Sequence, residues 1–371
     1  MSWQDVARVG EQNEVLERLE ESRLKLKESK PHANLVVPFK SFKASRKNET
    51  CTTLGAIRAF LDDQLARLTV ENRVLSVSFS ELKRPVKYFW GVHDFVRGVR
   101  GAVLGHQYLT SIGVLHRDIS ENNVVLARRP GEERGYLIDF DMAKLQEPEE
   151  RTLNVVTPQS EDFSDDDYDV GRSSSPISED GANPPKALRT GTIPYMSFNV
   201  LHGRKHTRFD DMESFLYVVF LFFFSYTGPL SKEELRDADA RGFVQPTGSG
   251  RFTHTRRWPE LLETWSDARK MYPIAQHKDS NLATQAGVTT FLNHPEVKHS
   301  LRQNWASGLQ EDIKRLLFPL WRLFANSRIS ISPGLSLPRT EVEHQQFINV
   351  LDKWLKKYGG KEQEFSNCPF T

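Results

Sequence analysis

The chain has 371 residues and a formal net charge of +1, from 50 lysines and arginines against 49 aspartates and glutamates. This balance excludes a global electrostatic attraction to nucleic acid or to an anionic membrane surface. Hydrophobic residues make up 38% of the chain, enough for about two domains, or one large two-lobed domain, at ~150 residues per unit. Two cysteines far apart in sequence exclude a disulfide framework and a cysteine-rich zinc site, and we expect a reducing compartment.

The first predicted element is an amphipathic helix over residues 4–29, where apolar residues recur at three- and seven-residue intervals among many charged ones. An edge strand is predicted over 34–42, interrupted by Pro38. A second short strand is predicted over 73–79, where apolar residues partly alternate with polar ones.

The next predicted element is a helix over 94–112, with Gly113 in the position of a C-terminal cap. A very short strand follows at 114–115. Two apolar runs, 124–127 and 136–138, are then separated by turn-forming residues, which is the pattern of a β-hairpin.

Residues 159–186 differ in composition, because Asp, Glu, Ser, Gly and Pro dominate and large apolar residues are nearly missing. This composition predicts a disordered insertion. The chain after it is mainly helical in character to about residue 358, and we expect a flexible tail over 359–371.

No membrane association is expected from the sequence. The N-terminus is polar and charged, without the apolar stretch of a signal peptide. The most apolar run, residues 215–226, is shorter than the ~20 residues that a membrane-spanning helix needs, and it predicts a buried helix instead. We therefore expect a cytoplasmic or nuclear location.

Residues 116–123, HRDISENN, have the form H-R-D-x-x-x-x-N and lie just before the predicted hairpin. In phosphoryl transfer, an aspartate faces the attacking hydroxyl, while an asparagine and a second aspartate across a hairpin hold Mg²⁺ against the phosphates. The second aspartate here is Asp139, sixteen residues after Asn123 in the string LIDFD. The joint spacing predicts a phosphoryl-transfer site rather than solvated loop carboxylates.

Two further strings fall in the order that a protein kinase requires. Residues 191–196, GTIPYM, resemble the end of an activation segment, and residues 210–214, DDMES, lead into the predicted buried helix. A carboxylate is favoured at a helix N-terminus. In kinases an aspartate there holds the backbone of the H-R-D loop, and we assign that role of structural support to Asp211.

The chain resembles the fungal-type protein kinase family. Four strings carry the resemblance: LHRDISENNVVL (115–126), YLIDFDMAK (136–144), RTGTIPYMS (189–197) and FDDMESFLYVVF (209–220). The resemblance implies an α+β, bilobal protein-kinase-like fold with an incomplete N-terminal lobe and a mainly helical C-terminal lobe. We expect the partial N-lobe over 1–93 and the C-lobe over 94–358.

The resemblance also implies ATP and Mg²⁺ as cofactors and phosphoryl transfer to a Ser or Thr of a protein substrate. Asp118 matches the catalytic base. Asn123 and Asp139 match the metal ligands, and His116 and Arg117 match the scaffold of the catalytic loop.

Three departures from the family pattern lie in the C-terminal lobe. Asp141 stands at the third position of D-F-G, without the backbone freedom of glycine. Ser120 stands where a lysine often follows the catalytic aspartate. Residues 197–199, SFN, stand where A-P-E would, so we expect the usual buried Glu–Arg pair under the activation segment to be missing.

The fourth and largest departure lies at the N-terminus. No G-x-G-x-x-G occurs, and no lysine precedes the first helix, in which Glu14 would be the partner of the strand lysine. We expect the first three strands of a kinase to have no residues to form them, so that the chain is a fragment of a longer kinase or a degenerate kinase.

Weak or no activity is expected for the chain as written. Without the Gly-rich loop and the strand lysine, the phosphates should be poorly aligned, and misplacement by ~1 Å can cost on the order of 10²-fold in rate. Two alternatives to a protein serine/threonine kinase stay open. One is a pseudokinase that acts as an interaction scaffold. The other is a small-molecule, aminoglycoside-type phosphotransferase, which shares the spacing of the catalytic residues but would not be expected to carry GTIPYM.

The insertion 159–186 lies where kinases carry a regulatory loop. Ser164, followed by three aspartates, and Ser175, followed by proline, are candidate phosphorylation sites, with Arg117 and Arg189 as candidate anchors for the phosphate. A solvated spacer is the alternative.

The basic cluster 251–258 interleaves arginines with aromatic residues, but the near-zero net charge and the lack of a binding motif predict no nucleic-acid partner. Scattered histidines such as His202, His206 and His254 lack the spacing of metal ligands, so we expect satisfied surface or core histidines. The oligomeric state is not predicted.

Overall fold

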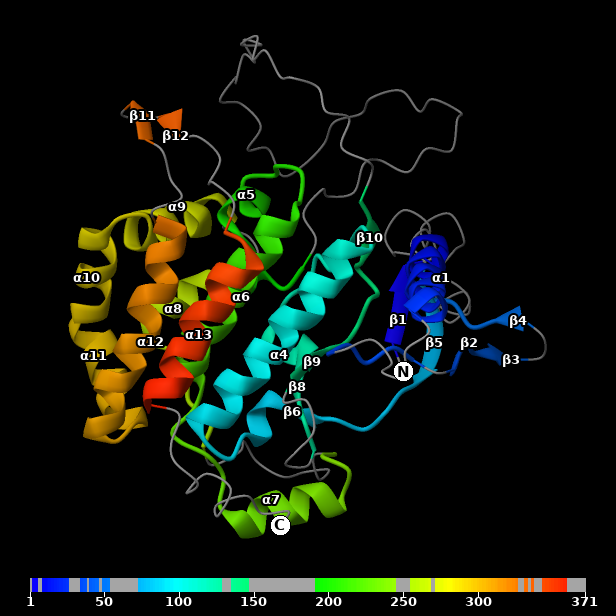
Figure 1. Ribbon diagram of the computed structural model, residues 1–371, viewed down its shortest axis with the longest axis horizontal. Coiled ribbons are helices and arrows are strands. Elements are labelled where there is room, and N and C mark those ends of the chain that lie inside the picture. The colour runs from blue at the N-terminus through cyan, green and yellow to red at the C-terminus, as the bar shows by residue number, and fades with distance from the viewer. Residues whose placement is uncertain are drawn as a thin grey trace.

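The structure, a computed structural model, combines helices with several small sheets (Figure 1). It describes residues 2–5, 9–26, 34–38, 40–46, 49–53, 73–128, 135–146, 191–244, 254–267, 271–325, 330–332, 335–336 and 342–358.

A helix and a small sheet form the N-terminal part of the structure, drawn in blue in Figure 1. Helix α1 (Val9–Leu26) is amphipathic, as predicted, and buries Val15 and Leu19. The antiparallel sheet has the strand order β1-β5-β2. Its strands are β1 (Ser2–Asp5), β5 (Arg73–Phe79) and β2 (Lys40–Lys43). Two shorter strands, β3 (Ser45–Arg46) and β4 (Glu49–Thr50), pair with each other.

Strand β1 corrects two expectations from the sequence. The predicted helix starts at Val9 rather than near residue 4, and a strand precedes it where none was expected. Four residues suffice for this strand because β5 offers a full edge, along which Ser2 pairs with Ser76 and Asp5 with Arg73. The strand predicted over 73–79 is confirmed as β5.

A second antiparallel sheet, of order β6-β8-β9, lies against α4 (Val92–Ser111). The predicted hairpin is confirmed, with Val125 opposite Tyr136. Its strands are β6 (Arg84–Pro85), β8 (Val124–Leu126) and β9 (Gly135–Leu137). The edge strand predicted over 34–42 is divided in two, because Leu35 forms a parallel bridge with Leu137 and the remainder begins β2.

Glycines let this hairpin lie directly on the backbone of α4. A Cβ atom at Gly135 would lie 1.7 Å from the carbonyl oxygen of Gly98, and one at Gly101 would lie 2.5 Å from the carbonyl oxygen of Gly135. No side chain fits in either place. Strand β9 is therefore fixed against the helix, and so is the position of the residues that follow it.

Arg84 anchors the connection from β5 to α4, and its side chain is fully buried. Its Nη atoms bind the Asp94 carboxylate at 2.7 and 2.9 Å. Nε and Nη2 donate to the carbonyl oxygen of Ala127, and Nη1 donates to that of Tyr88. These five bonds use all five donors of the guanidinium, which is how a buried charge is tolerated.

The helical part begins with α4, which confirms the helix predicted over 94–112. It ends at Ser111, and Gly113, two residues later, adopts the left-handed conformation, φ +74°. Strand β7 (Val114–Leu115) follows as predicted and pairs with β10 (Lys144–Leu145). Helix α6 (Arg208–Ser225) confirms the predicted buried helix, since all its residues from 210 to 224 are buried.

The remaining helices pack around α6 and α4, except α7, whose Leu235 and Ala238 lie in a separate cluster with Tyr88 and Trp90. They are α5 (Phe198–Leu201), α7 (Lys232–Ala240), α8 (Glu260–Glu263), α9 (Met271–Leu282), α10 (Gln285–Asn293), α11 (Pro295–Asn304), α12 (Ser307–Ala325) and α13 (His344–Tyr358). A two-stranded sheet of β11 (Ser330–Ser332) and β12 (Leu335–Ser336) lies between α12 and α13 in the chain.

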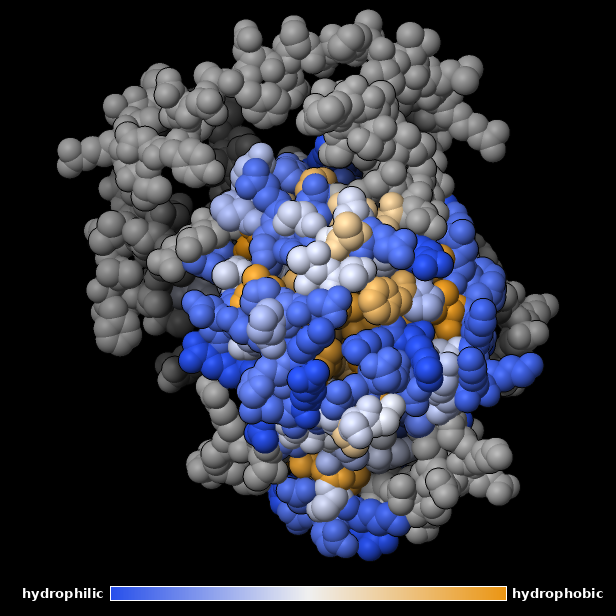
Figure 2. All heavy atoms as spheres, turned by 90° about the vertical axis from the view of Figure 1, so that its left-hand side faces the viewer, coloured by the Kyte–Doolittle hydropathy of each residue, from blue (hydrophilic) through white to orange (hydrophobic). Residues whose placement is uncertain are grey.

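The core of this part is aromatic, and Phe95 of α4 stacks on Phe222 of α6. The surface on the side of α10 and α11 is mostly hydrophilic, with a few hydrophobic residues scattered over it (Figure 2). The apolar sides of these helices therefore face α6. Among the described residues, none of the helices has both the length and the apolar composition to cross a membrane.

Candidate functional site

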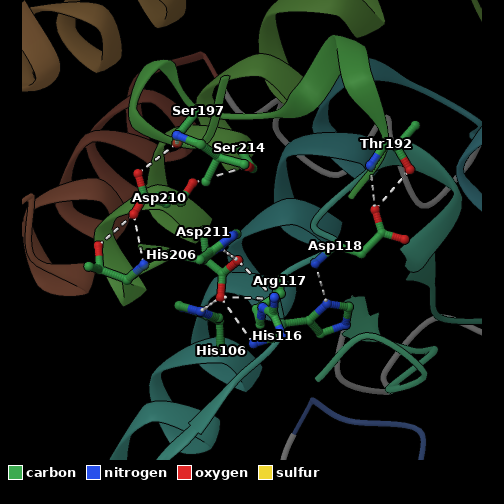
Figure 3. Close-up of polar contacts among 12 residues, drawn as sticks. His106, His116, Arg117, Asp118, Thr192, Ser197, His206, Asp210, Asp211 and Ser214 are labelled. Carbon is green, nitrogen blue, oxygen red and sulfur yellow. Dashed lines mark hydrogen bonds and ion pairs between the residues drawn. The ribbon is translucent and has the colours of Figure 1, made fainter. Parts of the chain in front are cut away.

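The loop between β7 and β8 carries Asp118, whose carboxylate is held on both oxygens. Oδ1 accepts hydrogen bonds from the backbone N and the Oγ1 of Thr192, each at 2.8 Å, and Oδ2 accepts one from Asn123 Nδ2 at 3.0 Å (Figure 3 shows the Thr192 contacts). Nδ2 of Asn123 also donates to the carbonyl oxygen of Asp118 at 2.8 Å. The donors fix the orientation of the carboxylate, and the amide oxygen of Asn123 is left as a ligand atom.

Asp139 follows β9 and adopts the left-handed conformation, φ +64°, which aspartate tolerates better than most residues. Its Oδ1 accepts a hydrogen bond from the backbone N of Asp141 at 3.2 Å. Desolvation, together with the negative charges of Asp141 and Asp118, raises the pKa of Asp139 to about 6.

These carboxylates fit a magnesium ion that is bound together with phosphates. Mg²⁺ prefers oxygen ligands and in nucleotide sites takes one or two carboxylates plus phosphate oxygens and water. Asp139 and Asn123 offer such oxygens, and the crowding of Asp139 with Asp141 and Asp118 is a repulsion that a cation relieves. No group of three or more His, Cys, Asp or Glu that could hold a metal by itself occurs in the described part of the chain.

Asp211, at the start of α6, holds the backbone of the loop 116–123. Its carboxylate accepts hydrogen bonds from the backbone N of His116 and of Arg117, both at 3.0 Å (Figure 3). Two further donors reach it, His106 Nε2 at 3.0 Å and His206 Nε2 at 2.8 Å. Arg117 has φ +67°, an unfavourable conformation for arginine that these contacts maintain.

The charge of Asp211 is stabilised despite complete burial. Burial alone would raise its pKa, but the positive potential of His206 and the hydrogen bonds from His106 and His206 hold the pKa well below its usual range. The carboxylate therefore stays ionised and keeps all its donors.

The histidines around Asp211 extend the network to the C-terminal helix α13. His106 Nδ1 lies 2.8 Å from His344 Nε2. Burial, with the positive charges of His106 and Arg208, lowers the pKa of His344 to about 3, so its ring is neutral. Sequence reasoning did not find His106 or His344, because single histidines in helices carry no spacing signal. It interpreted His206 as a satisfied histidine, which holds for one ring nitrogen only. Nε2 is bonded to Asp211, but Nδ1 is buried without a hydrogen-bond partner among the described residues.

His116 connects the catalytic loop to the residue before Asp139. Burial lowers its pKa against the opposing effects of Asp211 and Asp118, so the ring is neutral. Nε2 donates to the carbonyl oxygen of Ile138 at 3.0 Å, which leaves Nδ1 to accept the backbone N–H of Asp118 at 3.4 Å. The loop and the end of the hairpin are thus held in register.

Glu14 was predicted to support the site from the first helix, but the structure leaves it exposed to solvent. Helix α1 turns Val15 to the core, and Gln12, three residues earlier, shares that face and donates to Asp141 Oδ1. Glu11 Oε1 lies 3.7 Å from Lys144 Nζ. The side chains of α1 that face the site are therefore Gln12 and Glu11 rather than Glu14.

Residues 197–199, SFN, are held by hydrogen bonds to two carboxylates of α6. Ser197 caps α5 and donates to Asp210 Oδ1 at 2.6 Å, while the backbone N of Phe198 donates to Glu213 Oε1 at 3.1 Å. Ser120 is buried before the helical turn 121–123.

Several predicted features lie outside the described residues. They are the insertion 159–186 with Ser164 and Ser175, Arg189, and the tail 359–371.

Comparison with known proteins assigns the chain to a family. A search of curated proteins found no match to the chain. A family model described as fungal protein kinase matches residues 2–223. The match covers more than half of the chain and includes the catalytic loop, Asp139, the string GTIPYM and Asp211. The chain belongs to the fungal protein kinase family.

Proposed function

We propose that the chain is a protein kinase that transfers the γ-phosphoryl group of ATP, with Mg²⁺, to a serine or threonine of a protein substrate. One observation carries this proposal: Thr192, near the start of the segment 191–196, holds the carboxylate of Asp118. The family membership supports a kinase-like transferase. We further propose that the elements before residue 93 and the helices after it are the two lobes of a kinase, with the site between them.

Asp118 is the group that we assign to the acceptor hydroxyl. With Oδ1 engaged by Thr192 and Oδ2 by the amide of Asn123, the carboxylate has a single orientation toward an incoming hydroxyl. Such a carboxylate aligns the hydroxyl and accepts its proton as the new bond to phosphorus forms. Asp211 contributes indirectly, by fixing the loop backbone at His116 and Arg117.

Asn123 and Asp139 are the residues that would hold Mg²⁺. The ion would supply positive charge that neutralises the charge of the phosphates. Within the chain, the bond from Ile138 N to the carbonyl oxygen of Asn123, 3.0 Å, keeps the two ligand residues side by side across the hairpin.

The contact of Thr192 with Asp118 favours a protein substrate over a small molecule. It brings the backbone of 191–196 next to the proposed base, where an extended peptide has main-chain groups to bind. A small-molecule phosphotransferase needs no such segment.

The decisive experiment is transfer from radiolabelled ATP to an acidic and a basic generic protein substrate, with phosphoamino-acid analysis. Because no Gly-rich loop occurs in the 371 residues, ATP should be used at millimolar concentration. We expect label on serine or threonine, a loss of at least about 10²-fold in Asp118→Asn, and dependence on Mg²⁺ that EDTA removes. Asp352→Asn, a surface substitution, is the matched control and should keep full activity.

Other outcomes decide between the alternatives. Label on metabolites such as aminoglycosides but not on proteins would identify a small-molecule phosphotransferase. Binding of Mg-ATP without any transfer would identify a scaffold. Equal activity in the wild type and Asp118→Asn would overturn the role that we assign to Asp118.

A further inference from the structure

Lys278 of α9 is fully buried and reaches the segment next to the proposed base. Its Nζ donates to the carbonyl oxygens of Pro194 and Met196, both at 2.8 Å. Burying an ammonium group is costly unless it is hydrogen-bonded. A methionine of the same length would fill this space without that cost, so packing alone does not explain a lysine here.

Two aromatic rings complete the surroundings of Lys278. Nζ lies 3.7 Å from the ring centroid of Tyr217 and 5.0 Å from that of Trp265. The faces of such rings carry negative potential and stabilise a cation. The Tyr217 hydroxyl donates to Glu213 Oε1 at 2.5 Å, so this ring is itself fixed.

The segment that Lys278 contacts is one short turn with its ends held separately. Residues 193–195 form a 3₁₀ turn, in which Tyr195 N donates to Thr192 O at 2.9 Å and Met196 N to Ile193 O at 3.1 Å. The first end is bound to Asp118 through Thr192, and the second to Lys278 through Pro194 and Met196. The turn therefore connects the ammonium group directly to the proposed base.

Glu213 continues this anchoring by accepting the backbone N–H of Phe198. The family pattern places a Glu–Arg pair under this segment, and residues 197–199 cannot supply it. In this chain Lys278 and Glu213 hold the segment through its main-chain atoms instead. Lys278 lies beyond the matched residues 2–223.

We infer that Lys278 is a positioning residue, which fixes the turn 193–195 so that Thr192 stays on Asp118 and the acceptor site keeps its shape. The inference for substrate binding rests on the proposed function. The inference for the turn does not, because it concerns hydrogen bonds within the chain.

Amide hydrogen exchange of the full chain tests the inference without any activity. In Lys278→Met we expect exchange at Thr192, Tyr195, Met196 and Phe198 to rise about tenfold or more, since a hydrogen bond to a charged group is worth about that factor. Leu282→Ala is the control, because Leu282 is a buried residue of the same helix. It should lower global stability without selective exchange at these amides.

Lys278→Arg keeps the positive charge and the donors and should restore most of the protection. If Lys278→Met does not fold, Lys278→Gln takes its place, with the same expectation for the four amides. Exchange at these amides within twofold of the Leu282→Ala control would overturn the inference.

A kinetic measurement extends the test to the substrate. We expect Lys278→Met to lower kcat/KM for the protein substrate about tenfold or more while the affinity for Mg-ADP stays within twofold. Equal losses in kcat/KM and in the affinity for Mg-ADP would indicate a general structural role of Lys278 and overturn the positioning role. If the wild type transfers no phosphate, the proposed function fails, and the exchange measurement still decides whether Lys278 positions the turn.

Discussion

The loop 116–123 and the segment 139–145 face the same site, yet the chain holds them in different ways. The first, with 191–196, is the hydroxyl side of the proposed function, and there Asp118 and the loop backbone are bound by buried groups such as Asp211. The second, with the start of α1, is the proposed phosphate side, where Asp139 and Asp141 crowd together and partly exposed contacts with α1 support them.

This difference shows which geometry folding alone establishes. The hydroxyl side is complete in its hydrogen bonds, so its shape belongs to the folded chain. The phosphate side concentrates negative charge at Asp139, and in the proposed function a bound cation would compensate this charge.

The comparison predicts its largest effect for Asp211→Ala, which removes the acceptor of four donors in a buried site. We expect the free energy of unfolding in urea to fall by about 3–5 kcal/mol, because the donors are left unpaired. Asp352→Ala is the control. Asp352 also pairs with a cation, Arg100, but at the surface, so about 1 kcal/mol or less is expected. If both variants lost the same free energy of unfolding, the buried contacts of Asp211 would stabilise the chain no more than the exposed ion pair of Asp352.

His344 predicts a pH dependence on the hydroxyl side. Its folded-state pKa of about 3 lies below its ordinary value of 6.5, so the unfolded chain binds the proton more readily. The resulting stability is complete above pH 6.5 and is lost as the pH falls toward 3, by about 1.4 kcal/mol per pH unit.

The measurement compares unfolding of the wild type with that of His344→Gln, which can still bond to His106. Between pH 6 and 4 the wild type should lose up to about 2–3 kcal/mol more than the variant. Other buried histidines with lowered pKa, such as His116 and His277, are common to both chains and cancel. Parallel pH profiles would show that His344 takes no part.

Gly191 tests how closely the turn approaches the catalytic loop. It has φ +122°, and a Cβ there would lie 3.0 Å from the carbonyl oxygen of Arg117. Gly228 also has positive φ, +79°, but open space around it. We expect Gly191→Ala to lower the free energy of unfolding by about 2 kcal/mol and Gly228→Ala by about 1 kcal/mol. Only the first should also reduce phosphoryl transfer.

The smallest effect is expected on the phosphate side. Lys144→Gln removes the ion pair between Lys144 and Glu11. The side chains of both residues are more than 40% exposed. We expect a loss of at most about 0.5 kcal/mol in thermal or urea unfolding. A loss above 2 kcal/mol would mean that this side is as firmly built by folding as the other.

Much of this arrangement could be predicted from the sequence because it follows from local patterns. The hairpin of β8 and β9 has two apolar runs around a turn, and α6 is apolar enough to be buried on all sides. The motif spacing located Asp118, Asn123 and Asp139 on neighbouring segments, although their catalytic roles stay predictions.

Other features could not be predicted because they depend on packing between distant segments. Gln12 rather than Glu14 faces Asp141, since the orientation of α1 is decided by which residues reach the core. His106 and His344 are 238 residues apart, and Lys278 lies 82 residues from Met196. No local pattern signals such pairs. Strand β1 was missed because four residues carry too little periodicity.

The sheet β6-β8-β9 carries the two connections to the N-terminal elements at its opposite edges. At one edge Arg84 and Pro85 pair with β8, and at the other Leu35 pairs with Leu137 of β9. The hairpin that carries Asn123 and Asp139 lies between these two pairings. Any change in how the N-terminal elements sit on this sheet would therefore act on Asn123 and Asp139 from both sides, in addition to the contact of Gln12 with Asp141.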